Sequence, residues 1–433
     1  MNYEEAISYL EGLKIFGVRL GLARITELLD RLGTPQERYR TVHVTGTNGK
    51  GSVSAMLSGI LCRAGIRTGF YSSPHLVSYT ERVRVDGELI SEQAFADGIA
   101  EIKHHAACMV REGLECPTQF EVLTALAFHH FAVRHVEYAV IEVGLGGTLD
   151  STNVITPEVS VITNVAFEHA DRLGGTLESI AENKAGIIKE GVPVVTAAKG
   201  IPLDIIRRVA GERNADSFVC GMDFSVRLAS CDKRTQSLVF SSPLLGIAEL
   251  PYKLHLLGVH QVENSAVAIM TAMLLQSIES RVTAQSIVEA LSLVSWPARF
   301  ERLSLGEQEI IVDGAHNPAG TKVLRESLDA FFPAMPRVFL LGILRDKDID
   351  TMLHTLLRAD DEVVVTMPHS ERADTVDDLA ARVQKYCAHV AVQQENGQAL
   401  DRALQKAKGK LLVIAGSLYL VGEIRHLLIE RRR

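Results

Sequence analysis

Apolar residues near the N-terminus recur at helical spacing and are followed by short apolar strands. Their recurrence every three or four positions in residues 7–13 and 25–32 is typical of amphipathic helices, so we predict two short helices before a first strand at residues 40–44. A helix at residues 50–64 and a strand at residues 67–71 are expected next. This order of strand, loop, helix and strand is typical of a nucleotide-binding α/β domain.

Two apolar segments predict the centre of the sheet. Residues 138–143 and 159–165 show no clear polar alternation, which is typical of parallel strands covered on both faces. Asp86 and Gly87 predict a hairpin turn, because glycine readily adopts the positive φ needed there. Further helices are expected at residues 92–111, 120–133 and 177–188, and a further strand at residues 192–196. The core sheet is therefore predicted to be doubly wound and mostly parallel.

The pattern changes twice in the second half of the chain. Residues 218–257 show short alternating β patterns, which we interpret as a small antiparallel addition to the first domain. After helices at residues 260–276 and 283–294, an α/β alternation begins again. Its strands are expected at residues 310–313, 338–341, 362–366 and 411–415. We therefore predict a P-loop ATPase domain at residues 1–296 and a smaller C-terminal α/β domain at residues 297–433.

Composition narrows the class of partner. The 433 residues are 47% hydrophobic and 23% charged, with a formal net charge of −8, which argues against a general nucleic-acid footprint. The six cysteines are scattered, so disulfides and a structural zinc are not indicated. The acidic N-terminus and the lack of an 18-residue apolar run indicate neither secretion nor a membrane span. We expect a cytoplasmic monomer that acts on small molecules.

Residues 45–52, hereafter the phosphate loop, join the first strand to a helix. Such glycine-rich turns direct backbone N–H groups at phosphate oxygens, while a lysine, here Lys50, neutralises phosphate charge. The match to the common pattern is imperfect, since Val44 replaces the first glycine and Gly51 separates Lys50 from Ser52. The alternative is a glycine-rich turn with a surface lysine; we favour ATP binding. The expected ATP contacts are Gly46, Thr47, Asn48, Gly49, Lys50, Gly51 and Ser52.

A second group of polar residues follows later strands. Glu142 ends an apolar strand, at the edge where open α/β sheets bind ligands, and its carboxylate suits Mg²⁺. His169 follows the next strand, and its residue type leaves a ligand role and an ordinary hydrogen-bonding role equally open. Lys184 lies in a helical segment, where spacing alone indicates only a solvated charge.

Four short segments, at residues 45–52, 142–153, 182–189 and 313–318, together resemble folylpolyglutamate synthase and dihydrofolate synthase. These enzymes are Mur-ligase-like ATP-dependent amide synthetases. The resemblance implies a central ATPase domain and a smaller C-terminal domain that closes over the nucleotide. Mur ligases proper carry an additional domain before the phosphate loop, so the short segment preceding Thr45 favours the folate branch.

The resemblance also assigns metal and nucleotide roles. Ser73, Glu142 and His169 match Mg²⁺ ligands or their supports, with Ser52 completing the metal set and two ions expected. Lys184 matches a lysine that CO₂ carbamylates, which would turn a cation into an anionic oxygen ligand and replaces the interpretation from spacing. The remaining implied residues are Asn264, Arg299 and Asp313 as ATP contacts and His316 as a helper on the phosphate side.

The resemblance places the pterin substrate among four segments of the first domain. The implied contacts are Leu20, Gly21, Leu22, Ser72, Pro74, His75, Thr118, Gln119, Phe120, Leu149, Asp150 and Ser151. The chain departs from the family at Thr148, where related sequences commonly have Arg.

The implied reaction transfers the ATP γ-phosphoryl group to a substrate carboxylate, after which the amine of L-glutamate attacks the acyl phosphate. Lys50, Lys184 and His316 are the expected catalytic residues. Lys50 and the two Mg²⁺ ions are expected to hold and neutralise the negative charge that develops. We expect a bifunctional enzyme that acts on dihydropteroate and on reduced folates. A monofunctional folylpolyglutamate synthase is the first alternative. A non-catalytic nucleotide switch is more remote, because the chain lacks an Asn-Lys-x-Asp guanine motif.

Overall fold

The computed structural model describes residues 1–168, 170–370, 372–373 and 375–432. The chain forms two compact units. Unit 1 consists of Met1–Arg227, Leu238–Lys253 and Glu263–Val294, and unit 2 consists of Leu228–Ser237, Leu254–Val262 and Ser295–Arg433.

Unit 1 is built on an eight-stranded sheet in the order β4-β3-β2-β5-β1-β6-β7-β8. Its strands are β1 Arg40–Thr45, β2 Thr68–Tyr71, β3 Val83–Val85, β4 Glu88–Leu89, β5 Tyr138–Glu142, β6 Val159–Ile162, β7 Val194–Thr196 and β8 Ser217–Val219. β1 lies between β5 and β6 and is parallel to both. Only the β2–β3 and β3–β4 pairs are antiparallel. The predicted doubly wound, mostly parallel sheet is therefore confirmed.

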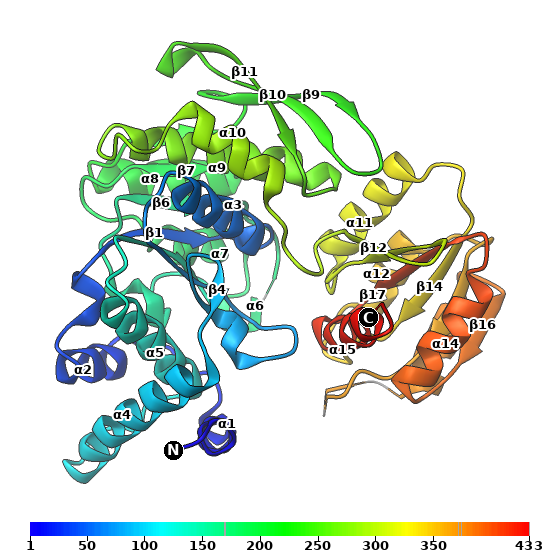
Figure 1. Ribbon diagram of the computed structural model, residues 1–433, viewed down its shortest axis with the longest axis horizontal. Helices are drawn as coiled ribbons and strands as arrows, with labels where there is room; N and C mark the ends of the chain where they lie inside the picture. Colours follow the sequence, from blue (N-terminus) through cyan, green and yellow to red (C-terminus); the bar gives the residue numbers. More distant parts are fainter. Residues whose placement is uncertain (169, 371, 374, 433) are drawn as a thin grey trace. The chain divides into compact units, whose positions relative to one another are not determined.

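Helices cover both faces of this sheet (Figure 1). The helices are α1 Tyr3–Gly12, α2 Ala23–Arg31, α3 Lys50–Arg63, α4 Glu92–Arg111, α5 Gln119–Val133, α6 Ala170–Leu173, α7 Leu177–Ala185, α8 Ile201–Glu212, α9 Val259–Gln276 and α10 Ala284–Leu293. One hydrophobic core joins α1, α2, α4 and α5 to the sheet, through residues such as Leu10, Ile25, Phe128 and Ile141. α3 and α10 lie on the opposite face (Figure 1). The phosphate loop therefore connects a buried strand directly to a buried helix.

Several element ends differ from the predictions. β6 ends at Ile162, before the predicted residue 165, because the next residues turn to bond to the phosphate loop. α7 ends at Ala185, where Gly186 packs closely against Thr148. α8 and β8 were not predicted, although α8 begins with a proline in its first turn, where proline is favoured. The predicted hairpin turn is present, with φ of 53° at Asp86 and 83° at Gly87.

A second sheet of three strands has the order β11-β10-β9. It contains β9 Ser225–Cys231, β10 Gln236–Ser242 and β11 Ile247–Leu254, and is the small antiparallel sheet expected from the alternating pattern. Its residues are divided between the two compact units.

Unit 2 contains a six-stranded sheet in the order β12-β13-β17-β14-β15-β16. Its strands are β12 Glu301–Leu305, β13 Gln308–Val312, β14 Arg337–Leu341, β15 Glu362–Val365, β16 His389–Val392 and β17 Leu411–Ala415. Its helices are α11 Pro318–Phe331, α12 Ile349–Leu356, α13 Val376–Val383, α14 Asn396–Lys406 and α15 Leu418–Glu430. The edge strands β12 and β16 were not predicted, because they are only partly buried and lack a continuous apolar run. The C-terminal α/β fold is confirmed.

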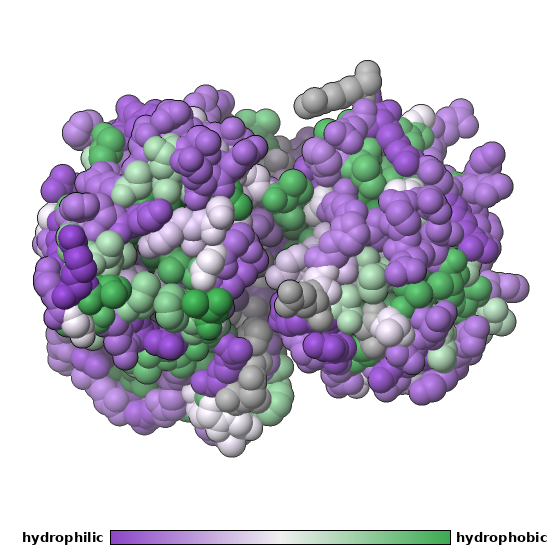
Figure 2. All heavy atoms as spheres, turned by 90° about the horizontal axis from the view of Figure 1, so that it is seen from below, coloured by the Kyte–Doolittle hydropathy of each residue, from purple (hydrophilic) through white to green (hydrophobic). Residues whose placement is uncertain are grey.

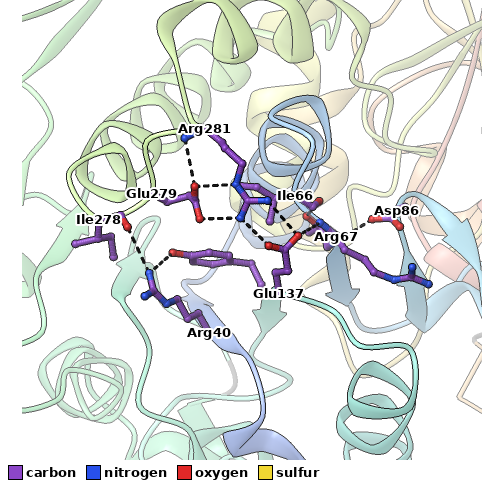
Figure 3. Close-up of polar contacts among 10 residues, drawn as sticks. Arg40, Ile66, Arg67, Asp86, Glu137, Ile278, Glu279 and Arg281 are labelled. Atoms are coloured by element: carbon purple, nitrogen blue, oxygen red, sulfur yellow. Dashed lines mark hydrogen bonds and ion pairs between the residues drawn. The ribbon is translucent and has the colours of Figure 1, made fainter.

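Charged side chains join the strand starts of unit 1 (Figure 3). The phosphate loop follows the opposite end of β1. Arg281, between α9 and α10, pairs with Glu137 at 2.6 Å and with Glu279 at 2.9 Å. Glu137 also accepts a hydrogen bond from the backbone N–H of Arg67. Arg40, at the start of β1, donates to the hydroxyl of Tyr138. These contacts fasten the α9–α10 connection to the sheet.

Hydrophilic residues predominate on the face drawn in Figure 2, and apolar residues form smaller patches between them. Among the residues that the structure describes, no helix is both long and apolar enough to cross a membrane.

Candidate active site

The phosphate loop leaves β1 with two glycines in backbone conformations that other residues rarely adopt. Gly46 has φ 148° and Gly49 has φ 87°, and α3 begins at Lys50. The N-terminus of a helix presents backbone N–H groups and a partial positive charge, both of which favour phosphate. The Lys50 Nζ folds back over the loop and donates to the carbonyl oxygens of Gly46, at 2.9 Å, and Thr47, at 3.2 Å. The start of α3 is therefore the part of the loop that is suited to binding an anion.

The two residues that follow β6, Thr163 and Asn164, are hydrogen-bonded to this loop. The N–H of Thr47 donates to the Asn164 carbonyl at 2.9 Å, and the N–H of Asn48 donates to Asn164 Oδ1 at 3.0 Å. Thr163 Oγ1 donates to the Asn48 carbonyl at 2.6 Å. A Cβ at Gly46 would collide with that hydroxyl. Sequence reasoning missed both residues as site residues, although their position at the end of a strand beside β1 was the signal.

Lys184 lies on α7 and points at the same loop. Its Nζ donates to the Gly46 carbonyl at 2.8 Å, the oxygen that also accepts from Lys50. The residue is only 5% exposed, so the interpretation from spacing alone, a solvated charge, is wrong. Burial, reinforced by the charge of Lys50, lowers the pKa of Lys184 to about 7, while Glu168 opposes this shift.

Glu142 ends β5 beside the phosphate loop, because β5 pairs with β1 in a register that places Glu142 opposite Val44. Its carboxylate is buried, and Oε2 accepts from the backbone N–H of Ser73 at 3.2 Å. Ser52 is also buried, in the first turn of α3. A carboxylate and hydroxyl groups near a phosphate site fit Mg²⁺, which takes oxygen ligands and usually binds through a few protein groups plus phosphates and water. The predicted ligand His169 lies outside the described residues.

The loop after Glu142 packs against the helix that carries Lys184. A Cβ at Gly147 would lie 2.6 Å from the Asn183 carbonyl oxygen, and one at Gly146 would collide with the Asn183 side chain. Thr148 donates to that carbonyl through its N–H and its hydroxyl, at 2.9 and 3.0 Å. A Cβ at Gly186 would collide with Thr148. Thr148 therefore holds the C-terminal end of α7 in place through these contacts.

Asp150 organises the same loop from within the protein. Its buried carboxylate accepts from the N–H of Leu145 at 2.8 Å and from the N–H and hydroxyl of Thr152 at 3.0 and 2.6 Å. Because the Thr152 hydroxyl donates its proton to Asp150, it must accept from His43 Nε2, 2.8 Å away. Burial lowers the pKa of His43 to about 3, so the ring is neutral with its proton on Nε2.

The residues implied for the pterin side all lie in unit 1. Phe120, in the first turn of α5, packs so closely on Gly144 that a Cβ there would collide with its ring. Gln119 donates to the hydroxyl of Tyr79 at 2.9 Å, and Thr118 caps α5. The N–H of Gly21 donates to the Leu149 carbonyl at 3.4 Å.

His75 has a defined tautomer in this group. Arg82 Nε donates to its Nδ1 at 2.9 Å, and its ring lies 4.3 Å from that of Tyr79, centroid to centroid. Burial, with the Arg82 charge, lowers the pKa of His75 to about 3. The neutral ring therefore carries its proton on Nε2. The N–H of Ser72 donates to the Arg82 carbonyl, and Pro74 follows a cis peptide bond. Leu20, Leu22 and Ser151 complete the residues expected here.

Asn264, on α9, reaches the phosphate loop from another direction. A Cβ at Gly49 would lie 2.5 Å from Asn264 Oδ1. The amide side chain therefore lies directly against the residue that precedes α3.

Unit 2 gathers its own predicted residues at the end of β13. The buried carboxylate of Asp313 accepts from the N–H groups of Phe300, at 2.7 Å, and Ala315, at 2.8 Å. Burial raises the pKa of Asp313, and the charge of Arg299 opposes this shift. His316 Nδ1 donates to the Gly314 carbonyl at 2.7 Å, because a carbonyl oxygen can only accept.

The backbone around Arg299 is strained. Ala298 and Phe300, on either side of it, have φ of 59° and 46°, in the left-handed region that costs residues with a Cβ free energy. A Cβ at Gly314 would lie 2.9 Å from Arg299 Nη1. Arg299 is thus held against the turn that carries Asp313 and His316.

Two family models cover most of the chain: the Mur ligase middle domain matches residues 44–272, and the C-terminal domain of dihydrofolate synthetase matches residues 298–428. The folylpolyglutamate synthase of Lacticaseibacillus casei is 36% identical over 99% of both chains. The dihydrofolate synthase/folylpolyglutamate synthase of Bacillus subtilis is 33% identical over 98% of both chains.

A solved structure of E. coli FolC in complex with DHPP and ADP has a TM-score of 0.87 to this chain. It is 31% identical and covers 100% of this chain and 99% of its own. These matches extend along both units and confirm the resemblance inferred from the four motifs. The chain therefore belongs to the folylpolyglutamate synthase/dihydrofolate synthase family of the Mur ligases and is an ATP-dependent glutamate ligase.

Proposed function

We propose that this chain is bifunctional and adds L-glutamate both to dihydropteroate and to the glutamate tail of reduced folates. The observation that carries this proposal is the position of Phe120 against Gly144, since the implied pterin side then adjoins the loop that follows Glu142. The B. subtilis relative is named for both activities, and E. coli FolC was solved with DHPP and ADP. The L. casei relative is named as a folylpolyglutamate synthase, so the single activity is the alternative.

The proposed reaction begins at the phosphate loop. A carboxylate oxygen of the substrate attacks the γ-phosphorus of ATP, the bond to ADP breaks, and an acyl phosphate forms. The amine of L-glutamate then attacks the acyl carbon, releasing phosphate and a proton as the amide forms. Lys50 lies over the loop, where it neutralises charge that develops on the phosphates. Asn264, Arg299 and Asp313 are proposed ATP contacts, and His316 is proposed to assist on the phosphate side.

The proposed metal ligands are Ser52, Ser73, Glu142, His169 and Lys184. When bound, Mg²⁺ would neutralise phosphate charge and hold the transferring group in line. Glu142 has the buried, hydrogen-bonded carboxylate that this role requires.

Carbamylation of Lys184 is also proposed, because the side chain is buried beside a second lysine, Lys50. The neutral Nζ would attack CO₂, form an N–C bond and lose a proton, which gives an anionic carbamate. The reaction needs an uncharged amine, and a buried lysine beside a second lysine favours that form.

A cytoplasmic location is supported by the state of the cysteines. All six are free thiols, as expected in a reducing compartment. The monomeric state remains a prediction.

The test is a product assay with purified protein, ATP and L-glutamate. We expect glutamate-dependent ADP formation, and the glutamylated product by mass spectrometry, with dihydropteroate and separately with tetrahydrofolate. Activity with tetrahydrofolate alone would establish the single-activity alternative. Nucleotide binding without formation of either glutamylated product would support the alternative of a non-catalytic nucleotide switch. Lys50→Ala should abolish both activities, and Lys408→Ala, which changes an exposed lysine of unit 2, should leave them unchanged.

A further inference from the structure

The short segment after β6, residues 163–166, is hydrogen-bonded to the phosphate loop along most of its length. Besides the bonds of Thr163 and Asn164 to residues 47 and 48, Ala166 exchanges two bonds with the hydroxyl of Thr47. The Ala166 N–H donates to Thr47 Oγ1 at 2.9 Å, and Thr47 Oγ1 donates to the Ala166 carbonyl at 3.1 Å. The loop and the segment therefore form one interlocked piece.

In this arrangement, the backbone N–H groups of the phosphate loop fall into two sets that point in different directions. The N–H groups of Thr47 and Asn48 both point to Asn164, one to its carbonyl and one to its side chain. They therefore turn toward the sheet, whereas in an ordinary phosphate loop such groups surround the phosphate oxygens. Phosphate binding then depends on the start of α3, from Gly49 onward.

Thr163 fixes the other side of the loop. Its buried hydroxyl lies 2.6 Å from the Asn48 carbonyl and 3.3 Å from the Thr45 carbonyl, and it fills the space beside Gly46 where a Cβ would otherwise lie. The carbonyl of Gly46 is the oxygen on which Lys50 and Lys184 converge. The Thr163 hydroxyl is thus bonded on both sides of Gly46, the residue whose carbonyl oxygen accepts from both lysines.

We propose that Thr163 and Asn164 are positioning residues for ATP. They hold residues 46–48 in the conformation that leaves the start of α3 facing the triphosphate. The inference rests on the proposed function of the loop as the ATP site. A loop held in this way is already ordered before nucleotide binds. Its conformational entropy is lost when the protein folds, so binding does not have to order it. Loss of the hydrogen bonds made by either residue should weaken ATP binding and leave binding of the pteridine substrate unchanged.

The decisive variants are Thr163→Val and Thr163→Ser in the full-length protein. Valine has nearly the same shape but no hydroxyl, so the Kd for ADP and the KM for ATP should rise by about fivefold to tenfold, the usual effect of losing one hydrogen bond. Serine keeps the hydroxyl and should bind nucleotide within about twofold of the wild type. The KM for tetrahydrofolate should be unchanged in both.

Thr196 offers a matched control. It ends the neighbouring strand β7, one strand further from β1 than Thr163, and is fully buried. Its hydroxyl donates to the Ile162 carbonyl at 2.7 Å and accepts from the Ala198 N–H at 3.0 Å. Thr196→Val therefore removes an equivalent buried hydrogen bond. We expect lower thermal stability and an unchanged Kd for ADP.

Asn164→Ala provides a second test, because Asn164 is only half-buried and its truncation leaves a smaller defect if Thr163→Val does not fold. Calorimetric titration with ADP should show weaker binding by a similar factor. The inference is overturned if Thr163→Val or Asn164→Ala binds ADP as tightly as the wild type, or if Thr196→Val loses as much affinity. Failure of the wild type itself to bind ADP would overturn the proposed function, and this inference with it.

Discussion

The two ends of the unit 1 sheet use charged residues in opposite ways. At the strand starts, Arg281 is paired with Glu137 and Glu279 and remains 42% exposed. At the strand ends, Glu142 and Lys184 are 4% and 5% exposed, and the chain between them relies on glycines that allow close packing. Exposed pairs of this kind contribute modestly to stability, whereas buried charges are costly and are typical of functional sites. Stability and chemistry are thus separated along the same strands.

The contrast is sharpest in two lowered pKa values with opposite meanings. Hydrogen bonds from Arg281 lower the pKa of Glu279 to about 2, which shows that the fold stabilises the charged carboxylate. Burial lowers the pKa of Lys184 to about 7, which shows that the fold disfavours the charged ammonium. Only the second group gains reactivity from its environment, because only there is the neutral form made accessible.

The largest effect is expected from removing the buried lysine. Lys184→Ala should lower kcat/KM by about 100-fold or more, the range found when a charge-stabilising group is lost from an active site. Added acetate or formate should restore part of the activity, since a small anion can occupy the space of the proposed carbamate. Steady-state assays with and without these anions measure both effects. Activity equal to that of the wild type, without added anion, would refute the carbamate role.

A smaller but still large effect is expected from Gly46→Ala. The new Cβ would collide with the Thr163 hydroxyl, and the backbone at φ 148° is unfavourable for alanine. Strain of about 1–3 kcal/mol corresponds to a loss of about fivefold to 150-fold in ATP affinity. Gly113→Ala is the matched control, because Gly113 also has positive φ, 85°, but an added Cβ there would meet nothing within 4 Å. The control should retain the ATP affinity of the wild type, measured by titration; equal losses would contradict the steric argument.

The smallest effect on activity is expected from Arg281→Gln, at the strand starts of the unit 1 sheet. Arg281→Gln should leave kcat/KM unchanged and lower the thermal midpoint slightly at about pH 7. Because the folded pKa of Glu279 lies below the usual 4.5, its stabilisation is present above about pH 4.5 and is lost as pH falls toward about 2. The difference in midpoint between variant and wild type should therefore shrink between about pH 7 and pH 3. A difference that grows on acidification would contradict the assigned ion pairs.

The sequence predicted the buried elements better than the edges. β17 and α4 lie at their predicted positions, because long apolar or amphipathic patterns specify buried strands and helices. The edge strands β8, β12 and β16 were missed, since an edge strand needs no continuous apolar run. The motifs led to Lys50, Glu142 and, through the family resemblance, Lys184. They did not lead to Thr163 or Asn164, whose importance arises from the pairing of β6 with β1, a contact between distant parts of the chain.

Glutamate ligation through an acyl phosphate is tested most directly by following one oxygen atom. The substrate carboxylate is labelled with ¹⁸O, the enzyme is supplied with ATP and L-glutamate, and the released phosphate is examined by mass spectrometry. We predict one labelled oxygen in each phosphate released, because the attacking carboxylate oxygen leaves with the phosphoryl group. Product formation with unlabelled phosphate would contradict the mechanism.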